Sequence, residues 1–222
     1  MKLLEICAGS AEFTLHARTT GIDATSLDIK QFGNIDIVQD AEEITFDFLK
    51  QFDVVWFGTP CTTYSIAACS HHRDINLKPK TDFAIKCDRM NSKIVELFKR
   101  VEKVNSNFIY YIENPRGILR KMNFMRGLDR CTITYCKYGD KRMKPTDIWS
   151  NNLRDMFNPN GWQPKEMCFN GNKQCHHEAA PRGSRTGTQG LKNNHERSKM
   201  PKQLIESIIN NLNERSIISK EN

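Results

Sequence analysis

The chain has 222 residues, 38% of them hydrophobic, with a formal net charge of +7 and a pI near 9.0. This length suits one domain with a sizeable core and a small appendage. The basic balance favours a polyanionic partner, although a solvated lysine-rich surface would give the same charge. No apolar run approaches the ~20 residues that span a bilayer, and the first residues lack a signal-peptide pattern, so we expect a cytoplasmic protein with no membrane partner.

Up to about residue 150 the chain alternates strand-like and helix-like segments. The predicted strands are the runs KLLEIC, ATSLDI, NIDIVQD, FDVVWFG, NFIYYIEN, CTITYCKYG and TDIWSN. EFTLHARTTG has helical spacing, and the stretch from Asp82 to Val104 has the pattern of a long amphipathic helix. Near-continuous apolar strands alternating with helices indicate an α/β fold, with a mostly parallel sheet covered on both faces.

After Asn151 the composition changes to Asn, Gly, Gln, Arg and His, and the apolar periodicity ends. Helical spacing returns in PKQLIESIINNL, and the tail SIISKEN is expected to fray. We therefore predict a core at 1–150, a short basic segment without a core of its own at 151–196, and a C-terminal helix at 197–222 that packs back on the core.

Polar residues stand where the predicted strands end. They are Glu5 with the AGS turn, Asp28, Asp40, Cys61 and Glu113. Ligands of open parallel sheets bind at the carboxyl ends of the strands, so we expect these side chains to line one functional edge.

Two of these segments, GTPCTTYS and YIENPRG, together resemble the cytosine-5 DNA methyltransferases. LEICAGSAEF is similar to the cofactor-binding motif of that family, VELFKRVEKV to the helix after its catalytic loop, and RSKMPKQLIESI to its final motif. The resemblance covers roughly residues 1–150 and 195–212, and it implies a minimal, phage-like form with a short target-recognition segment. The implied fold is the Rossmann-like fold of class I S-adenosylmethionine-dependent methyltransferases.

The resemblance assigns the chemistry of base methylation to four residues. Cys61 would add to carbon 6 of cytosine, Glu113 would act at ring nitrogen 3, Asn114 would orient that glutamate, and Pro60 would stiffen the strand exit. A buried structural thiol is the alternative for Cys61, and the Glu-Asn pair on the next strand favours catalysis.

The implied cofactor is S-adenosylmethionine, with S-adenosylhomocysteine as product. The residues expected around it are Glu5, Ala8, Gly9, Phe13, Asp28, Ile29, Asp40, Gly58 and Pro60. Asp28 would bind the ribose and Asp40 the adenine, whereas ordinary strand-end turn chemistry would also explain either aspartate. Ala11 and Glu12 replace smaller residues of the family motif, which predicts a less permissive turn.

The expected partner is double-stranded DNA, bound by a monomer that flips the target base, in a bacterial or phage-infected host cytoplasm. Candidate contacts are Ser65, Arg73, Arg142, Lys144, Arg182 and Arg185, with solvated surface charge as the alternative. Arg142 or Lys144 would substitute for a Gln-Arg-Arg cluster that the chain lacks. The short basic segment predicts short or relaxed sequence specificity. An RNA or tRNA cytosine methyltransferase, or a catalytically silent nucleic-acid-binding homologue, remains the alternative.

The cysteines do not suggest a disulfide framework, because they are scattered along the chain. Cys7, Cys69, Cys87, Cys131 and Cys136 are interpreted as packing residues. We expect no metal, with a zinc site formed by Cys168, Cys175, His176 and His177 as the weaker alternative.

Overall fold

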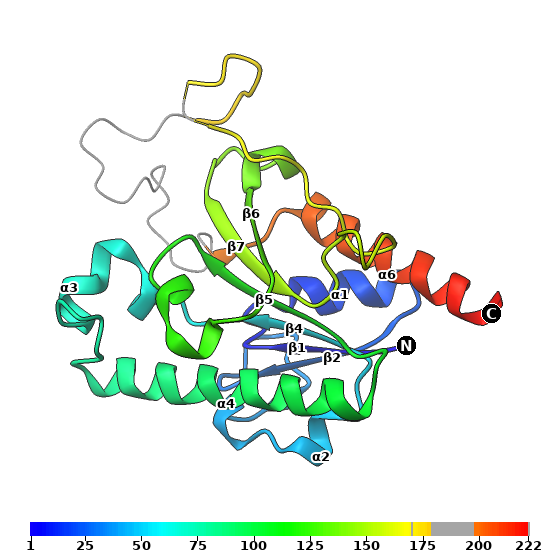
Figure 1. Cartoon of the computed structure of the whole chain (residues 1–222), viewed down its shortest axis with the longest axis horizontal. Helices are drawn as coiled ribbons and strands as arrows, with labels where there is room; N and C mark the ends of the chain where they lie inside the picture. Colours follow the sequence, from blue (N-terminus) through cyan, green and yellow to red (C-terminus); the bar gives the residue numbers. More distant parts are fainter. Residues whose placement is uncertain (170, 179–197, 222) are drawn as a thin grey trace.

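The computed structural model describes residues 1–169, 171–178 and 198–221 (Figure 1). Its seven-stranded sheet is built from β1 (Lys2–Ile6), β2 (Asp23–Asp28), β3 (Ile37–Val38), β4 (Val54–Gly58), β5 (Ile109–Pro115), β6 (Arg130–Thr134) and β7 (Pro145–Ser150). The spatial order is β3-β2-β1-β4-β5-β7-β6, and β7 runs antiparallel to both β5 and β6. The other neighbouring strands are parallel. The protein therefore has the predicted Rossmann-like class I methyltransferase fold.

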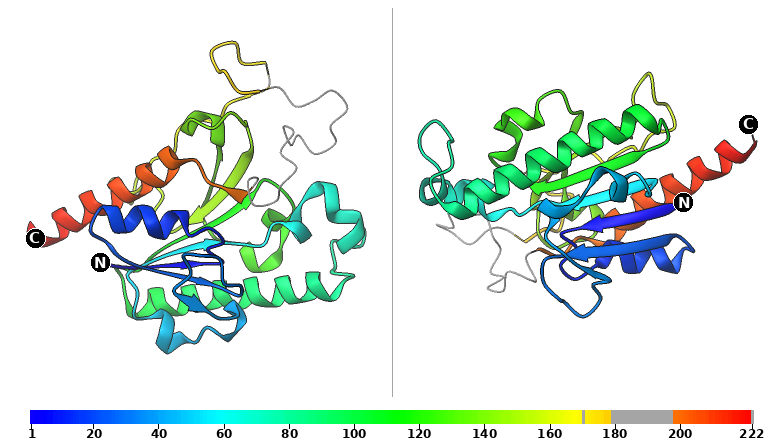
Figure 2. Two further views of the ribbon diagram at one scale, coloured as in Figure 1. Left: turned by 180° about the vertical axis from the view of Figure 1, so that it is seen from behind. Right: turned by 90° about the horizontal axis from the view of Figure 1, so that it is seen from below.

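Helices cover both faces of the sheet, as the apolar strands require (Figures 1 and 2). The helices α1 (Glu12–Thr19) and α6 (Lys202–Glu221) lie on one face, and α2 (Phe46–Leu49) and α4 (Asp82–Val104) lie on the other. No helix in the part of the chain that the structure describes is long and apolar enough to cross a membrane.

The predicted helix from Asp82 to Val104 is confirmed as α4, and its sequence explains both its start and its buried face. The hydroxyl of Thr81 caps the helix by accepting a hydrogen bond of 3.2 Å from the Ala84 N–H. Ile94, Phe98 and Val101 recur at helical spacing and are buried in the core against the sheet. The same helix holds the loop that carries Cys61, because Asp88 accepts a hydrogen bond from the Tyr64 hydroxyl and Asn91 donates one to it.

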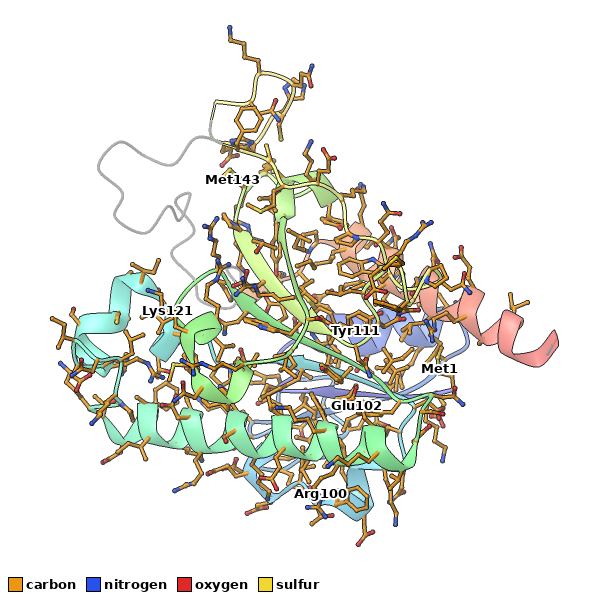
Figure 3. All side chains as sticks on the ribbon, in the orientation of Figure 1. Met1, Arg100, Glu102, Tyr111, Lys121 and Met143 are labelled. Carbon is orange, nitrogen blue, oxygen red and sulfur yellow. The ribbon has the colours of Figure 1, made fainter. Side chains whose placement is uncertain are left out.

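The opposite face contains a stack of aromatic rings. Phe13 of α1 stacks on Trp56 of β4 with ring centres 4.6 Å apart, and Trp56 stacks on Tyr111 of β5 at 6.0 Å. Side chains fill this layer, in which Tyr111 is labelled in Figure 3. The layer also includes Leu204 and Ile208 of α6, so the C-terminal helix packs on the core.

One expectation about the C-terminal part is wrong. The core does not end at Asn151, because Trp162 is only 2% exposed and its indole N–H donates to the Ser207 hydroxyl at 2.7 Å. One tryptophan buries enough apolar surface to anchor a segment that lacks periodicity. The helix α6 runs to Glu221, the last described residue, and fraying of SIISKEN stays a prediction.

Candidate active site

The carboxyl ends of β1, β2, β4 and β5 meet at one edge of the sheet. Ile6 pairs with both Leu27 and Phe57, and Gly58 pairs with Glu113. This register places the polar residues that end these strands along the same edge, as predicted from the sequence.

The turn between β1 and α1 has an unusual backbone. Cys7, Gly9 and Ala11 each have φ of 56°, in the left-handed region that favours glycine. Such strain in non-glycine residues costs about 1–3 kcal/mol each and concentrates at functional sites. The Glu5 carboxylate accepts a 2.7 Å hydrogen bond from the Thr14 N–H, which fixes α1 to this turn. Burial raises the pKa of Glu5 to about 7.

Asp28 has the geometry expected of a ribose-binding carboxylate. It is buried, and its two oxygens accept hydrogen bonds from the N–H groups of Gly9 (2.9 Å) and Lys30 (3.0 Å). Each carboxylate oxygen can accept a further hydrogen bond, which suits a ribose hydroxyl. Beside it, Ile29 is 53% exposed, and an exposed apolar side chain suits the face of an adenine ring.

The space above the turn also fits a bound cofactor. A Cβ added at Gly9 would meet no atom within 4 Å, so the surface there is open. Ala8 is buried and its N–H donates to the Leu27 carbonyl at 3.1 Å, which connects the turn to β2. Gly58 and Pro60 are partly exposed at the neighbouring strand exit. The chemistry of this surface fits S-adenosylmethionine.

Two of the predicted cofactor residues have other partners. The Phe13 side chain is fully buried against Trp56 and does not line the open surface, and cofactor contact by this residue stays a prediction. One oxygen of Asp40 caps η1 (Ala41–Glu43) by accepting the Glu42 N–H, and the other pairs with Lys86. Burial opposes ionisation of Asp40, but these partners outweigh it and lower its pKa. Adenine contact by Asp40 stays a prediction.

The cysteine loop is joined to the end of β5. Cys61 is exposed and directly precedes η2 (Thr62–Tyr64). Behind it, the N–H and hydroxyl of Thr59 donate to the Glu113 carbonyl at 3.1 and 3.0 Å. The buried Asn114 amide donates to the Thr59 hydroxyl at 2.5 Å. Asn114 therefore holds the strand exit that precedes Cys61, whereas the sequence suggested that it orients Glu113.

Glu113 is oriented by a residue that the sequence did not identify. The Tyr135 hydroxyl, at the start of η6 (Tyr135–Tyr138), donates to a Glu113 carboxylate oxygen at 3.1 Å. Burial raises the pKa of Glu113, while the charge of Lys144 and the Tyr135 hydrogen bond oppose this shift. A carboxyl group with a raised pKa keeps its proton at higher pH, which suits a general acid.

Arg142 and Lys144, the two candidates for the missing basic cluster, have different surroundings. The Lys144 ammonium lies 4.4 Å from the centre of the Tyr135 ring. Burial lowers the pKa of Lys144, and coulombic interactions with Glu113 and Cys61 oppose this effect. Its backbone is strained, with φ of 27°. Arg142 instead pairs with Asp140 and donates to the Lys199 carbonyl at 3.2 Å.

Burial argues against the predicted nucleic-acid contact by Arg73. Its side chain has no exposed surface and forms a two-pronged ion pair with Asp88 at 2.7 and 2.9 Å. It also donates to the carbonyls of Thr63 (2.9 Å) and Leu77 (3.1 Å). Arg73 thus supports the cysteine loop from within. Ser65 is partly exposed between η2 and η3 (Ile66–Ala68), and its DNA contact stays a prediction.

The weaker zinc alternative is partly reproduced in the structure. Cys168, Cys175 and His177 lie together, but Cys136 joins them in place of His176, which is exposed. Cys136 is therefore not the simple packing residue that we expected. Arg182 and Arg185 lie outside the described residues.

Sequence reasoning missed Tyr135 because CTITYCKYG shows only strand-like alternation. Tyr135 reaches Glu113 through the turn after β6 and the insertion of β7 between β5 and β6. The sequence predicted a strand that runs through Tyr135, whereas β6 ends at Thr134 and Tyr135 begins the turn η6.

No protein-family model and no curated protein sequence matches the chain significantly. Among solved structures, it is similar to the Entamoeba histolytica methyltransferase EhMeth, at 13% identity and a TM-score of 0.48, over 76% of this chain and 57% of that one. A mutant of Spodoptera frugiperda DNMT2 matches at 12% identity and a TM-score of 0.43, over 67% of this chain and 49% of that one. The chain thus spans about half the length of these two proteins. With TM-scores below 0.5, neither likeness bears on its activity.

Proposed function

We propose that the chain is an S-adenosylmethionine-dependent methyltransferase that modifies carbon 5 of cytosine in double-stranded DNA. The observation that carries the proposal is the pairing of two strand exits, one leading to the exposed Cys61 and the other ending in Glu113. Hydrogen bonds of Thr59 and Asn114 join the ends of these two strands. A nucleophile and an acid on adjacent rigid strands suit addition to an electron-poor ring.

In the proposed reaction the Cys61 thiolate adds to carbon 6 of a flipped-out cytosine. A proton or hydrogen bond from Glu113 at ring nitrogen 3 accepts the electron density, and carbon 5 becomes nucleophilic. S-adenosylmethionine supplies an electrophilic methyl group. Solvent water then accepts the hydrogen of carbon 5 as a proton, the Cys61 thiolate is expelled from carbon 6, and the proton at nitrogen 3 returns to Glu113, which restores the aromatic ring.

Lys144 serves this chemistry through its charge. A cation near a thiol favours the thiolate, and a buried cation interacts more strongly than one in water. The electrostatic interactions of Lys144 with Cys61 and Glu113 support this role. The backbone of Lys144 has φ of 27°, and backbone strain of this kind concentrates at functional sites.

Methyl transfer to defined substrates tests the proposal. Labelled S-adenosylmethionine is supplied with unmethylated duplex DNA or with unmodified tRNA, using the native chain and Cys61→Ala. We expect label on carbon 5 of cytosine in the duplex, and none with Cys61→Ala. Transfer to tRNA alone would establish the RNA alternative, and no transfer to either acceptor by a folded, cofactor-binding chain would favour the silent homologue.

A further inference from the structure

Three thiols and one imidazole converge at one point of the structure, and none of the four residues is assigned to methyl transfer. Cys136 belongs to η6, whereas Cys168, Cys175 and His177 belong to the segment that follows Trp162. One donor atom from each of the four residues lies within 4.8 Å of all the others. The four donors thus come from two parts of the chain. More than thirty residues separate Cys136 from Cys168, the first of the other three.

One pair of donor atoms, from Cys168 and His177, has the spacing of a tetrahedral zinc site. With Zn–S of about 2.3 Å and Zn–N of about 2.1 Å, tetrahedral angles place a sulfur and a nitrogen ligand about 3.6 Å apart. Cys168 Sγ and His177 Nδ1 are 3.6 Å apart. A thiol hydrogen-bonded to an imidazole would explain this pair alone, but not the arrival of two further thiols at the same point.

Hydrogen bonds from the surrounding loop fix the position of the Cys168 sulfur. The Cys168 N–H donates to the Thr134 hydroxyl at 2.8 Å, and the Asn172 amide lies 3.5 Å from the Cys168 sulfur. Amide groups directed at a ligand sulfur are typical of the outer sphere of metal sites. Apolar burial does not explain the loop, because Met167 and Phe169 are 39% and 65% exposed.

We propose that Cys136, Cys168, Cys175 and His177 bind one zinc ion in a structural site. Thiolate and imidazole ligands select zinc over magnesium or calcium, and four protein ligands leave no open position for catalysis. The ion would fasten the segment around Cys168 to η6, next to Tyr135.

The location of the site suggests its purpose. Cys136 directly follows Tyr135, whose hydroxyl donates to Glu113. On the other side, the Glu178 N–H donates to the Lys141 carbonyl at 2.8 Å, in the loop that leads to Lys144. The zinc ion would therefore stiffen the part of the chain that carries Tyr135 and Lys144. Metal binding itself does not depend on the proposed methyltransferase activity.

The test measures metal content in the intact chain. Protein purified with reductant and zinc, then freed of loose metal, should contain about one zinc ion per chain by mass spectrometry of the metal. Cobalt should give tetrahedral absorption bands together with thiolate-to-metal charge-transfer bands. Cys175→Ser and His177→Gln should lose the metal, whereas His176→Gln and Cys69→Ser should retain it.

Measurements on the native chain keep the proposal open to refutation even if a variant unfolds. Blocking the thiols with a mercurial reagent should release the zinc stoichiometrically. The proposal is overturned if the folded, reduced chain binds neither zinc nor cobalt, if its cobalt spectrum lacks thiolate bands, or if His176→Gln loses the metal as completely as His177→Gln.

Discussion

Replacing Arg73 by methionine separates a structural role from contact with nucleic acid. The change removes a fully buried guanidinium group and leaves the Asp88 carboxylate with the Tyr64 hydroxyl, which donates to it at 2.7 Å. The carbonyls of Thr63 and Leu77 also lose their side-chain donor. Thr63 lies two residues after Cys61, so the loss of these hydrogen bonds should loosen the loop that carries Cys61.

The expected destabilisation follows from the burial of this pair. Removing one partner of a buried ion pair costs about 3–5 kcal/mol. Asp88 keeps 18% of its side chain exposed, so water can partly solvate the remaining charge and the lower end, about 3 kcal/mol, applies. For a chain of this length, that loss corresponds to a decrease in melting temperature of about 6–12 °C.

Thermal and urea unfolding followed by circular dichroism measure this loss, with Arg126→Met as the control. Arg126 is exposed, so its replacement should change the free energy of unfolding by less than about 0.5 kcal/mol. A second variant carrying both Arg73→Met and Asp88→Asn should lose less than the sum of the single changes. Unchanged stability of Arg73→Met, together with weaker binding to DNA, would refute the reasoning and restore the phosphate contact predicted from the sequence.

Three further predictions concern the carboxyl edge of the sheet. Asp28→Ala should weaken S-adenosylmethionine binding by about 1–3 kcal/mol in calorimetry, and an unchanged dissociation constant would mean that the cofactor lies elsewhere. Because the native state holds the Glu5 proton up to about pH 7 and the unfolded chain releases it near its ordinary pKa of 4.5, the stability should fall by about 3 kcal/mol as pH rises through this interval. Urea unfolding of Glu5→Gln should lack most of this slope, and equal slopes would contradict the assignment. Lys144→Met should lower kcat about a hundredfold while Lys144→Arg retains part of it, and full activity of the methionine variant would exclude an electrostatic role.

The local sequence pattern was enough to predict the sheet and the edge at which the polar residues that end its strands gather. The residues before Gly58 and before Glu113 are apolar without alternation, which indicates strands that are buried on both faces. Parallel strands bring their carboxyl ends to one edge whatever loops connect them. Asp82–Val104 was predictable to the residue, because Thr81 caps a strongly periodic stretch. These features depend on neighbours in the sequence.

The features that the sequence did not predict depend on contacts between distant residues. From the sequence, Arg73 is an ordinary cation on a loop. Its ion pair with Asp88 of α4 becomes visible only in the folded structure. Cys136 is separated from Cys168 by β7 and the Trp162 segment, so no ligand spacing reveals that they meet. Trp162 sits in a polar stretch without periodicity, and the surface on which it packs comes from distant parts of the chain, α6 and Tyr111 of β5.

The central claim is that Cys61 forms a covalent bond with cytosine during turnover. Duplex DNA that carries 5-fluorocytosine at target positions blocks loss of the substituent at carbon 5, so the adduct cannot resolve. With S-adenosylmethionine present, the native chain should form a denaturation-resistant complex whose mass equals protein plus methylated oligonucleotide, and Cys61→Ala should form none. An active preparation that methylates ordinary DNA yet traps no adduct, or a trapped peptide that lacks Cys61, would contradict the account.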